Sequence, residues 1–155
     1  MTNDLKVRAA LQAYADRGVF RGFSDKKTRN GKAAFTFLWQ TQRPLEFIAD
    51  TNNGTLAFKN LLPDVPSGSA MHKDIKRFLD SLHDRGLPKH RRIDRARAEV
   101  VSINRGGNLS ILLKVKNNQY KYGVNRLVNL AHEMFVHLNN YYADYLSETF
   151  GLSQE

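Results

Sequence analysis

The sequence predicts an α+β domain in which helices pack on one face of an antiparallel sheet, in the order α-β-β-β-β-α-β-β-β-α. Near the start, in the middle and at the end of the chain, apolar residues recur every three or four positions, as in helices. Between these segments lie runs in which apolar and polar residues alternate, as in strands with one buried face. Tight-turn signals such as Asn30-Gly31 and Gly106-Gly107 join successive runs, which favours antiparallel pairing.

The composition is that of one domain, residues 1–155. The chain has 155 residues, of which 41% are hydrophobic, enough to bury a core without disulfides or metals. It contains 10 glycines and no cysteine, which excludes a collagen-like chain, a disulfide scaffold, a thiol enzyme and a Cys-ligated metal site. No stretch approaches the roughly 18 apolar residues of a membrane span, and the start has no apolar signal-peptide core. We therefore expect a cytoplasmic protein that binds no membrane.

The first helix is expected to begin at Asn3 or Asp4, which can cap it, and to end at residue 17 because Gly18 follows. Strands are predicted over residues 19–24 and 33–41, joined by a polar loop that ends in Asn30-Gly31. A second helix is predicted over residues 70–85, between a Pro-rich loop and Gly86.

Two further hairpins can be aligned by matching apolar residues. A loop at residues 42–44 would place Phe37 opposite Ala49, and a turn at residues 51–54 would place Ala49 opposite Leu56. Both alignments bring one apolar set to the same face: Phe35, Phe37, Trp39, Leu45, Phe47, Leu56 and Phe58. We interpret this face as the core; the alternative is a platform on which single-stranded nucleic acid stacks its bases.

The second half of the sheet is expected to have three strands. A two-residue turn at Gly106-Gly107 places Ala98 opposite Val115, and a turn at residues 117–118 would start a third strand that brings Lys121 beside Lys114. A last helix is predicted over residues 124–149. Its apolar stripe covers more than one side, which suits a helix held between the sheet and either another helix or another subunit.

Positive charge is concentrated in one region. The chain carries 24 Lys and Arg against 15 Asp and Glu, a net charge of +9. Residues 89–126 hold ten basic and two acidic side chains, whereas residues 127–155 hold four acidic and no Lys or Arg. Because guanidinium and ammonium groups bind phosphate and carboxylate oxygens, the candidate anion-binding residues are Lys89, Arg91, Arg92, Arg95, Arg97, Lys114, Lys116 and Lys121. These cations could instead form a solvated face, or be neutralised by the acidic last helix.

Apolar residues accompany these charges. In the predicted register the outer sheet face carries Val101, Ile103 and Leu112 among its cations, and the last helix carries Phe135 and Tyr142 on the widened part of its stripe. Exposed apolar patches mark protein interfaces. These five residues are the candidate interface, for a protein partner or for a second copy of the chain in a homodimer.

Motifs for catalysis or metal binding are not found. His132 and His137 lie five positions apart, so one helix cannot direct both to the same zinc ion. Ser67-Gly68-Ser69 lacks the glycines of a nucleophile elbow. We therefore predict no catalytic residue, no metal and no cofactor; an enzyme whose site is assembled from distant residues remains an alternative.

The predicted element order is similar to that of the secretion-chaperone-like folds, whose members are often homodimeric and bind proteins. This resemblance implies an interaction function, carried by element order alone. The sequence favours a non-enzymatic interaction domain with a protein partner or self-association. The alternatives are binding of nucleic acid or another polyanion through residues 89–126, and an enzyme with dispersed site residues.

Overall fold

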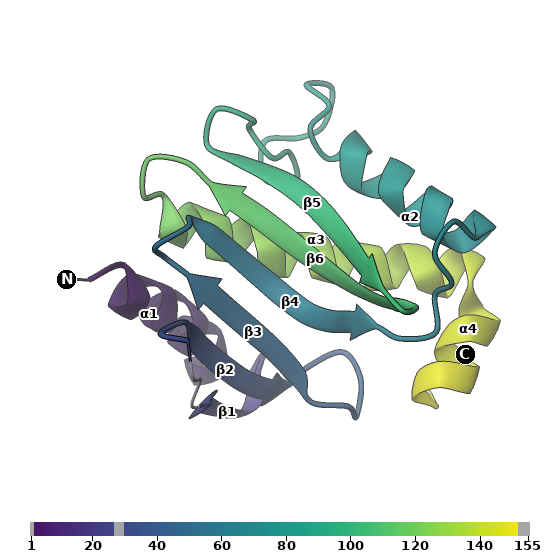
Figure 1. Ribbon diagram of the computed structural model, residues 1–155, viewed down its shortest axis with the longest axis horizontal. Helices are drawn as coiled ribbons and strands as arrows, with labels where there is room; N and C mark the ends of the chain where they lie inside the picture. The colour runs from purple at the N-terminus through teal and green to yellow at the C-terminus, as the bar shows by residue number, and fades with distance from the viewer. Residues whose placement is uncertain (1, 27–29, 152–155) are drawn as a thin grey trace.

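The computed structural model describes residues 2–26 and 30–151, in which six antiparallel strands form one layer and helices α1 and α3 cover one of its faces (Figure 1). The strands are ordered β1-β2-β3-β4-β6-β5 across the sheet. The α+β class with an antiparallel sheet is therefore confirmed. In chain order the elements are α1 (Asn3–Asp16), β1 (Arg21–Lys26), β2 (Ala33–Leu38), β3 (Leu45–Asp50), β4 (Thr55–Leu62), α2 (Ala70–Ser81), β5 (Ala98–Arg105), β6 (Asn108–Val115), α3 (Tyr120–Tyr141) and α4 (Ala143–Phe150).

Side-chain caps begin the first two helices. The hydroxyl of Thr2, rather than Asn3 or Asp4, accepts a hydrogen bond from the first turn of α1, and Ser69 does the same for α2. Gly18 follows α1 with a φ of 79°, a left-handed conformation that glycine adopts without strain. The α2 helix ends at Ser81, earlier than predicted, and the carbonyl of Leu82 just beyond it accepts a hydrogen bond from the N–H of Ile93 (2.8 Å). The polar loop predicted before Asn30-Gly31 lies partly outside the described residues.

Two of the predicted strand registers are confirmed and one is shifted. Ala49 pairs with Leu56, and Ala98 pairs with Val115, as expected. Phe37 pairs with Leu45 instead of Ala49, because the connection between β2 and β3 is longer than predicted. In that connection the hydroxyl of Thr41 accepts a hydrogen bond from the N–H of Arg43 (3.1 Å). The register moves by an even number of residues, so the same side chains still face the core.

The predicted third strand after β6 is wrong. Asn117 and Asn118 both adopt a positive φ (55° and 56°), and the chain then enters α3 at Tyr120. The hydroxyl of Tyr120 donates to the carbonyl of Thr51 (3.2 Å), which fixes this end of the helix beside the sheet. Lys121 therefore lies on α3 and not beside Lys114. The predicted last helix is also divided, because Tyr142 leaves the helical conformation and separates α3 from α4.

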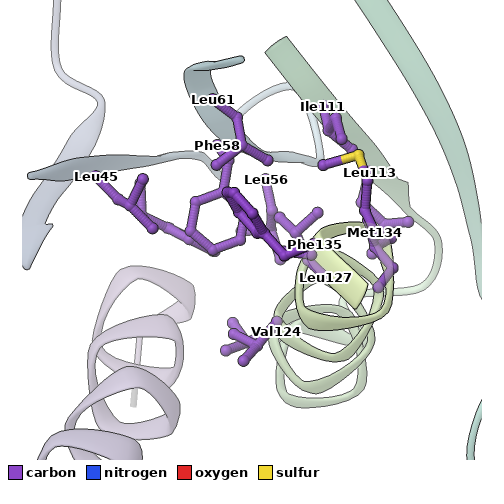
Figure 2. Packing of buried hydrophobic residues seen from close by; sticks show 14 of the residues in the cluster. Leu45, Leu56, Phe58, Leu61, Ile111, Leu113, Val124, Leu127, Met134 and Phe135 are labelled. Atoms are coloured by element: carbon purple, nitrogen blue, oxygen red, sulfur yellow. The ribbon is translucent and has the colours of Figure 1, made fainter. Parts of the chain in front are cut away.

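The core lies between the covered face of the sheet and α3. Figure 2 shows Leu56 and Phe58 of β4 and Leu113 of β6 meeting Leu127 and Met134 of α3. The face predicted to be the core is buried, apart from Trp39, which is half-buried against it. Because the rings on this face lie inside the core, they cannot stack nucleic-acid bases. None of the described helices is long and apolar enough to span a membrane.

Gly123 lets α3 approach the sheet closely. A Cβ atom at this position would lie 2.8 Å from Cγ2 of Val115 and 3.0 Å from Cδ1 of Leu56, and both side chains belong to the sheet. Contacts this short require the Val115 and Leu56 side chains, which are packed in the core, or the helix itself to shift. A residue without a side chain is therefore needed where α3 crosses β4 and β6.

We predict that Gly123→Ala lowers the free energy of unfolding by about 1–2 kcal/mol, because overpacking at this position costs about 2–3 kcal/mol and alanine regains roughly 1 kcal/mol in helix propensity. Urea denaturation of the full chain measures the change. Asn139→Ala, at an exposed position of the same helix, is the matched control and should change stability by about 0.5 kcal/mol or less. A Gly123→Ala variant as stable as the wild type would contradict the close approach.

Candidate functional site

The face of the sheet opposite α1 and α3, which we call the open face, carries a row of apolar side chains across five strands. Direct cross-strand pairing links Ala34 to Ile48, Ile48 to Ala57, Ala57 to Leu112, and Leu112 to Val101. Paired residues in neighbouring strands project to the same face. All except Ala34 are half-buried rather than buried. The sheet therefore presents a continuous apolar row on the face that α1 and α3 leave uncovered.

Charges of both signs flank this row. Lys26 forms an ion pair with Glu46 (2.9 Å), and Asp50 lies 3.8 Å from Lys32. Glu99 pairs across the strands with Lys114. The two ion pairs, but not Glu99 or Lys114, belong to the lining of a hollow of about 440 Å³ on this face. The lining also includes the centre of the apolar row and Ile103: Lys26, Asn30, Lys32, Glu46, Ile48, Asp50, Thr55, Ala57, Lys59, Asn60, Ile103, Arg105, Ser110 and Leu112.

The open face is less basic than the sequence indicates. The predicted contact between Lys114 and Lys121 does not form, because Lys121 lies on α3. Lys116 and Arg97 lie opposite each other, and the N–H of Lys116 donates to the carbonyl of Arg97 (2.9 Å), but their side chains diverge. The Lys116 ammonium donates to the carbonyl of Arg95 (2.7 Å), and the Arg97 guanidinium lies over the ring of Tyr122 (3.7 Å). Of the eight candidate anion-binding residues, Lys114 is the one whose cross-strand partners place it on the open face.

The basic segment, residues 89–92, packs against α3. Arg126 donates to the carbonyl of Lys89 (2.9 Å), and Arg91 forms an ion pair with Glu133 (3.2 Å). Asn129 donates to the carbonyl of His90 (3.4 Å). Glu133 of α3 thus neutralises one cation of this segment, Arg91, and not a cation of the sheet face.

Arg92 and Arg95 meet Arg85 in an arginine hollow of about 730 Å³, which is also lined by His83, Ile93, Asp94 and Ala96. The Asp94 carboxylate accepts a hydrogen bond from the N–H of Ala96 (3.0 Å), and Arg95 lies 3.8 Å from Glu99. Neither Arg85 nor Arg92 forms an ion pair with any residue that the structure describes. Arg85 was not predicted, because it precedes the basic run.

Arg97 and Lys121 meet Lys6 in a cleft of about 600 Å³ between α1 and the start of α3. No local sequence pattern places Lys6 with them, because this proximity arises from the packing of α1 against α3. The candidate anion-binding residues are therefore distributed over four surfaces, not gathered on one.

The candidate interface residues also separate. Val101 and Leu112 belong to the apolar row, and Ile103 lines the hollow beside it. Phe135 is 5% exposed, and its ring packs edge-on against Phe150 of α4, so α4 covers it within the same chain. Tyr142 lies at the break between α3 and α4.

One titratable cluster joins α2 to α3. The Nε2 of His137 donates to the carboxylate of Asp74 (3.0 Å), and its ring stacks on Phe78. The hydrogen bond from His137 is the main reason why the pKa of Asp74 is below its ordinary value of 3.8, and Tyr142 contributes a further hydrogen bond. His132 instead contacts Gln40 (2.8 Å). In the described part of the chain, no three His, Asp or Glu residues are close enough to hold a metal ion.

We predict that Asp74→Asn destabilises the protein at neutral pH by about 1–2 kcal/mol, because it removes a charged hydrogen-bond acceptor. The pKa of Asp74 is lower in the folded protein than the ordinary value of 3.8, so this contact stabilises the fold only while the carboxylate is ionised. The wild type therefore loses this stability as the pH falls below 3.8 and then through the folded-state pKa of Asp74. Urea denaturation at several pH values should therefore show the two proteins converging under acid conditions. A difference that is constant with pH would show that Asp74 does not act through its charge.

Comparisons with models of known protein families, with curated proteins and with solved structures found no match. The resemblance to secretion-chaperone-like folds therefore rests on element order alone. The surfaces formed by the described residues must indicate the function.

Proposed function

We propose that the chain is a cytoplasmic, non-enzymatic interaction domain that binds a protein partner on the open face. The observation that carries this proposal is the apolar row from Ile48 through Leu112 to Val101 on the side of the sheet opposite α1 and α3. Removing such a row from water favours association by about 25 cal/mol for each Å² of apolar surface, which offsets part of the translational and rotational freedom that the partners lose.

The charges around the row favour a protein over a polyanion. Glu46, Asp50 and Glu99 lie among the cations of this face, and each would repel a phosphate backbone. A protein surface offers charges of both signs and apolar side chains between them. The ion pair between Lys26 and Glu46 also leaves less positive charge for an anion to neutralise.

Photocrosslinking from position 112 tests this proposal. The full chain, carrying a benzophenone amino acid in place of Leu112, is irradiated in cells of the source organism, and the adducts are identified by mass spectrometry. We expect an adduct with one defined protein, which is lost when Ile48→Glu is added. The same amino acid at Lys73, an exposed position of α2, is the matched control and should not give that adduct.

Sedimentation velocity separates the two kinds of protein partner. If the adduct is a second copy of this chain, the wild type should sediment as a dimer and Leu112→Glu as a monomer with an unchanged circular dichroism spectrum. If position 112 gives no adduct, or gives the same adducts as position 73, the open face is not an interaction surface.

A second candidate function is binding of a nucleic-acid backbone in the arginine hollow. Arg85, Arg92 and Arg95 line this hollow together, and guanidinium groups bind phosphate oxygens in a forked geometry. The lining contains no Phe, Tyr or Trp, so base stacking would not contribute. Binding of this kind would be independent of sequence and sensitive to salt.

We predict that Arg85→Ala with Arg92→Ala weakens binding of a fluorescent mixed-sequence duplex and reduces the slope of log K against log salt by about 2, one unit for each lost phosphate contact. Fluorescence polarisation at several salt concentrations measures both quantities. Arg17→Ala with Arg21→Ala removes two exposed guanidinium groups from another part of the molecule and should leave the slope unchanged. Equal slopes for the wild type and the Arg85 and Arg92 variant would exclude the arginine hollow.

A further inference from the structure

The cleft between α1 and the start of α3 is separate from the open face and from the arginine hollow. Its volume of about 600 Å³ falls within the range of roughly 300–1,000 Å³ that is typical of small-molecule sites. Its lining comes from one side of α1, from Arg97 and from residues 118–122: Lys6, Ala9, Ala10, Ala13, Arg97, Asn118, Gln119, Tyr120, Lys121 and Tyr122.

The walls of the cleft are apolar. Ala9, Ala10 and Ala13 form the α1 side, and their small side chains leave the space open. The ring of Tyr122 forms part of the opposite side and is held in place on several sides. Its hydroxyl accepts a hydrogen bond from the N–H of Asp94 (3.0 Å), and the guanidinium groups of Arg97 and Arg126 lie 3.7 and 4.9 Å from its centre. The ring is therefore fixed in place before a ligand binds, and the part of it that the two guanidinium groups leave uncovered adds to the apolar wall.

The charges that line the cleft are all positive. Lys6, Arg97 and Lys121 come from three separate segments, and the lining contains no Asp or Glu. Arg97 is oriented by its stacking on Tyr122 and by a hydrogen bond from its Nε to the side chain of Gln119 (2.5 Å). Its two terminal nitrogens make no hydrogen bond to any described residue, so they can bind an oxyanion.

The two lysines complete the positive rim. Lys6 and Lys121 are exposed, and neither forms an ion pair within residues 2–26 and 30–151. The first turn of α3 adds to the positive potential, since the turn contains no acidic residue and Gln119 makes no side-chain cap to it. A negative head group at this rim would therefore meet three cationic groups that form no ion pair with any described residue.

We infer that this cleft binds a small amphipathic anion, whose apolar body lies between the α1 alanines and Tyr122 and whose anionic head is held by Arg97, Lys6 and Lys121. The apolar walls exclude a fully hydrated ion such as free phosphate as the preferred ligand, because such an ion would leave them without a partner. The cations favour an anionic ligand over a neutral one, because only an anion forms hydrogen bonds with them in which both groups are charged. A carboxylate with an unbranched apolar chain satisfies both parts of the cleft.

NMR titration of the ¹⁵N-labelled full chain with sodium decanoate, below its micelle concentration, tests the inference. We expect saturable shifts of the amide signals of Ala9, Ala13 and Lys121. Decanol, which has the same body without the charge, should bind at least about tenfold more weakly, because hydrogen bonds to charged groups contribute about 1.5–3 kcal/mol.

Two variants test the two parts of the cleft. Lys6→Gln with Lys121→Gln should weaken decanoate binding about tenfold, whereas Lys73→Gln with Lys76→Gln, which removes the same charge from exposed positions of α2, should not change it. Ala13→Phe, at an exposed helix position, should abolish binding by filling the cleft while leaving the other amide signals in place.

Three results would overturn the inference: no saturable shift, equal affinity for decanol and decanoate, or unchanged binding by Ala13→Phe. Leu112→Glu alters the open face and not the cleft, so it should bind decanoate like the wild type. A cleft that does not bind decanoate and an open face that does not bind a protein partner are therefore separate results.

Discussion

The packing of α3 against β4 and β6 is the interaction on which the rest of the structure depends. The helix buries ten residues along its length, and Leu127 and Met134 among them pack against Leu56 and Phe58 of β4 and Leu113 of β6 (Figure 2). Gly123 allows the backbone of the helix to come close to Leu56 and Val115. Because α3 and α1 share one face of the sheet, the sheet is covered on that side and open on the other (Figure 1).

This one-sided covering separates the positive charge into different surfaces. Residues 89–92 contact α3 and lose part of their charge to Glu133. Arg97 turns towards the first turn of α3, and Lys121 belongs to that turn. The open face keeps a mixture of charges around an apolar row. The region that is most basic in the sequence is therefore not one continuous basic surface, and each surface suits a different partner.

The sequence predicted those features that local chemistry determines. A two-residue turn at Gly106-Gly107 allows one register, so the pairing of Val101 with Leu112 could be predicted. The start of α3 could not, because Tyr120 and Tyr122 alternate with polar residues as in a strand, and a contact with Thr51, distant in sequence, holds Tyr120 in a helix. The meeting of Lys6 with Arg97 likewise depends on how α1 packs, which no local pattern indicates.

Hydroxyl-radical footprinting in cells tests the central claim most directly, because neighbouring side chains of β6 report on the two faces of the sheet. In the purified protein, Leu112 should be oxidised and Leu113, which lies under α3, should be protected. In cells, Leu112 should become protected, while Val136 of α3, which is 45% exposed, remains reactive. Equal oxidation of Leu112 in cells and in the purified protein would show that nothing covers the open face.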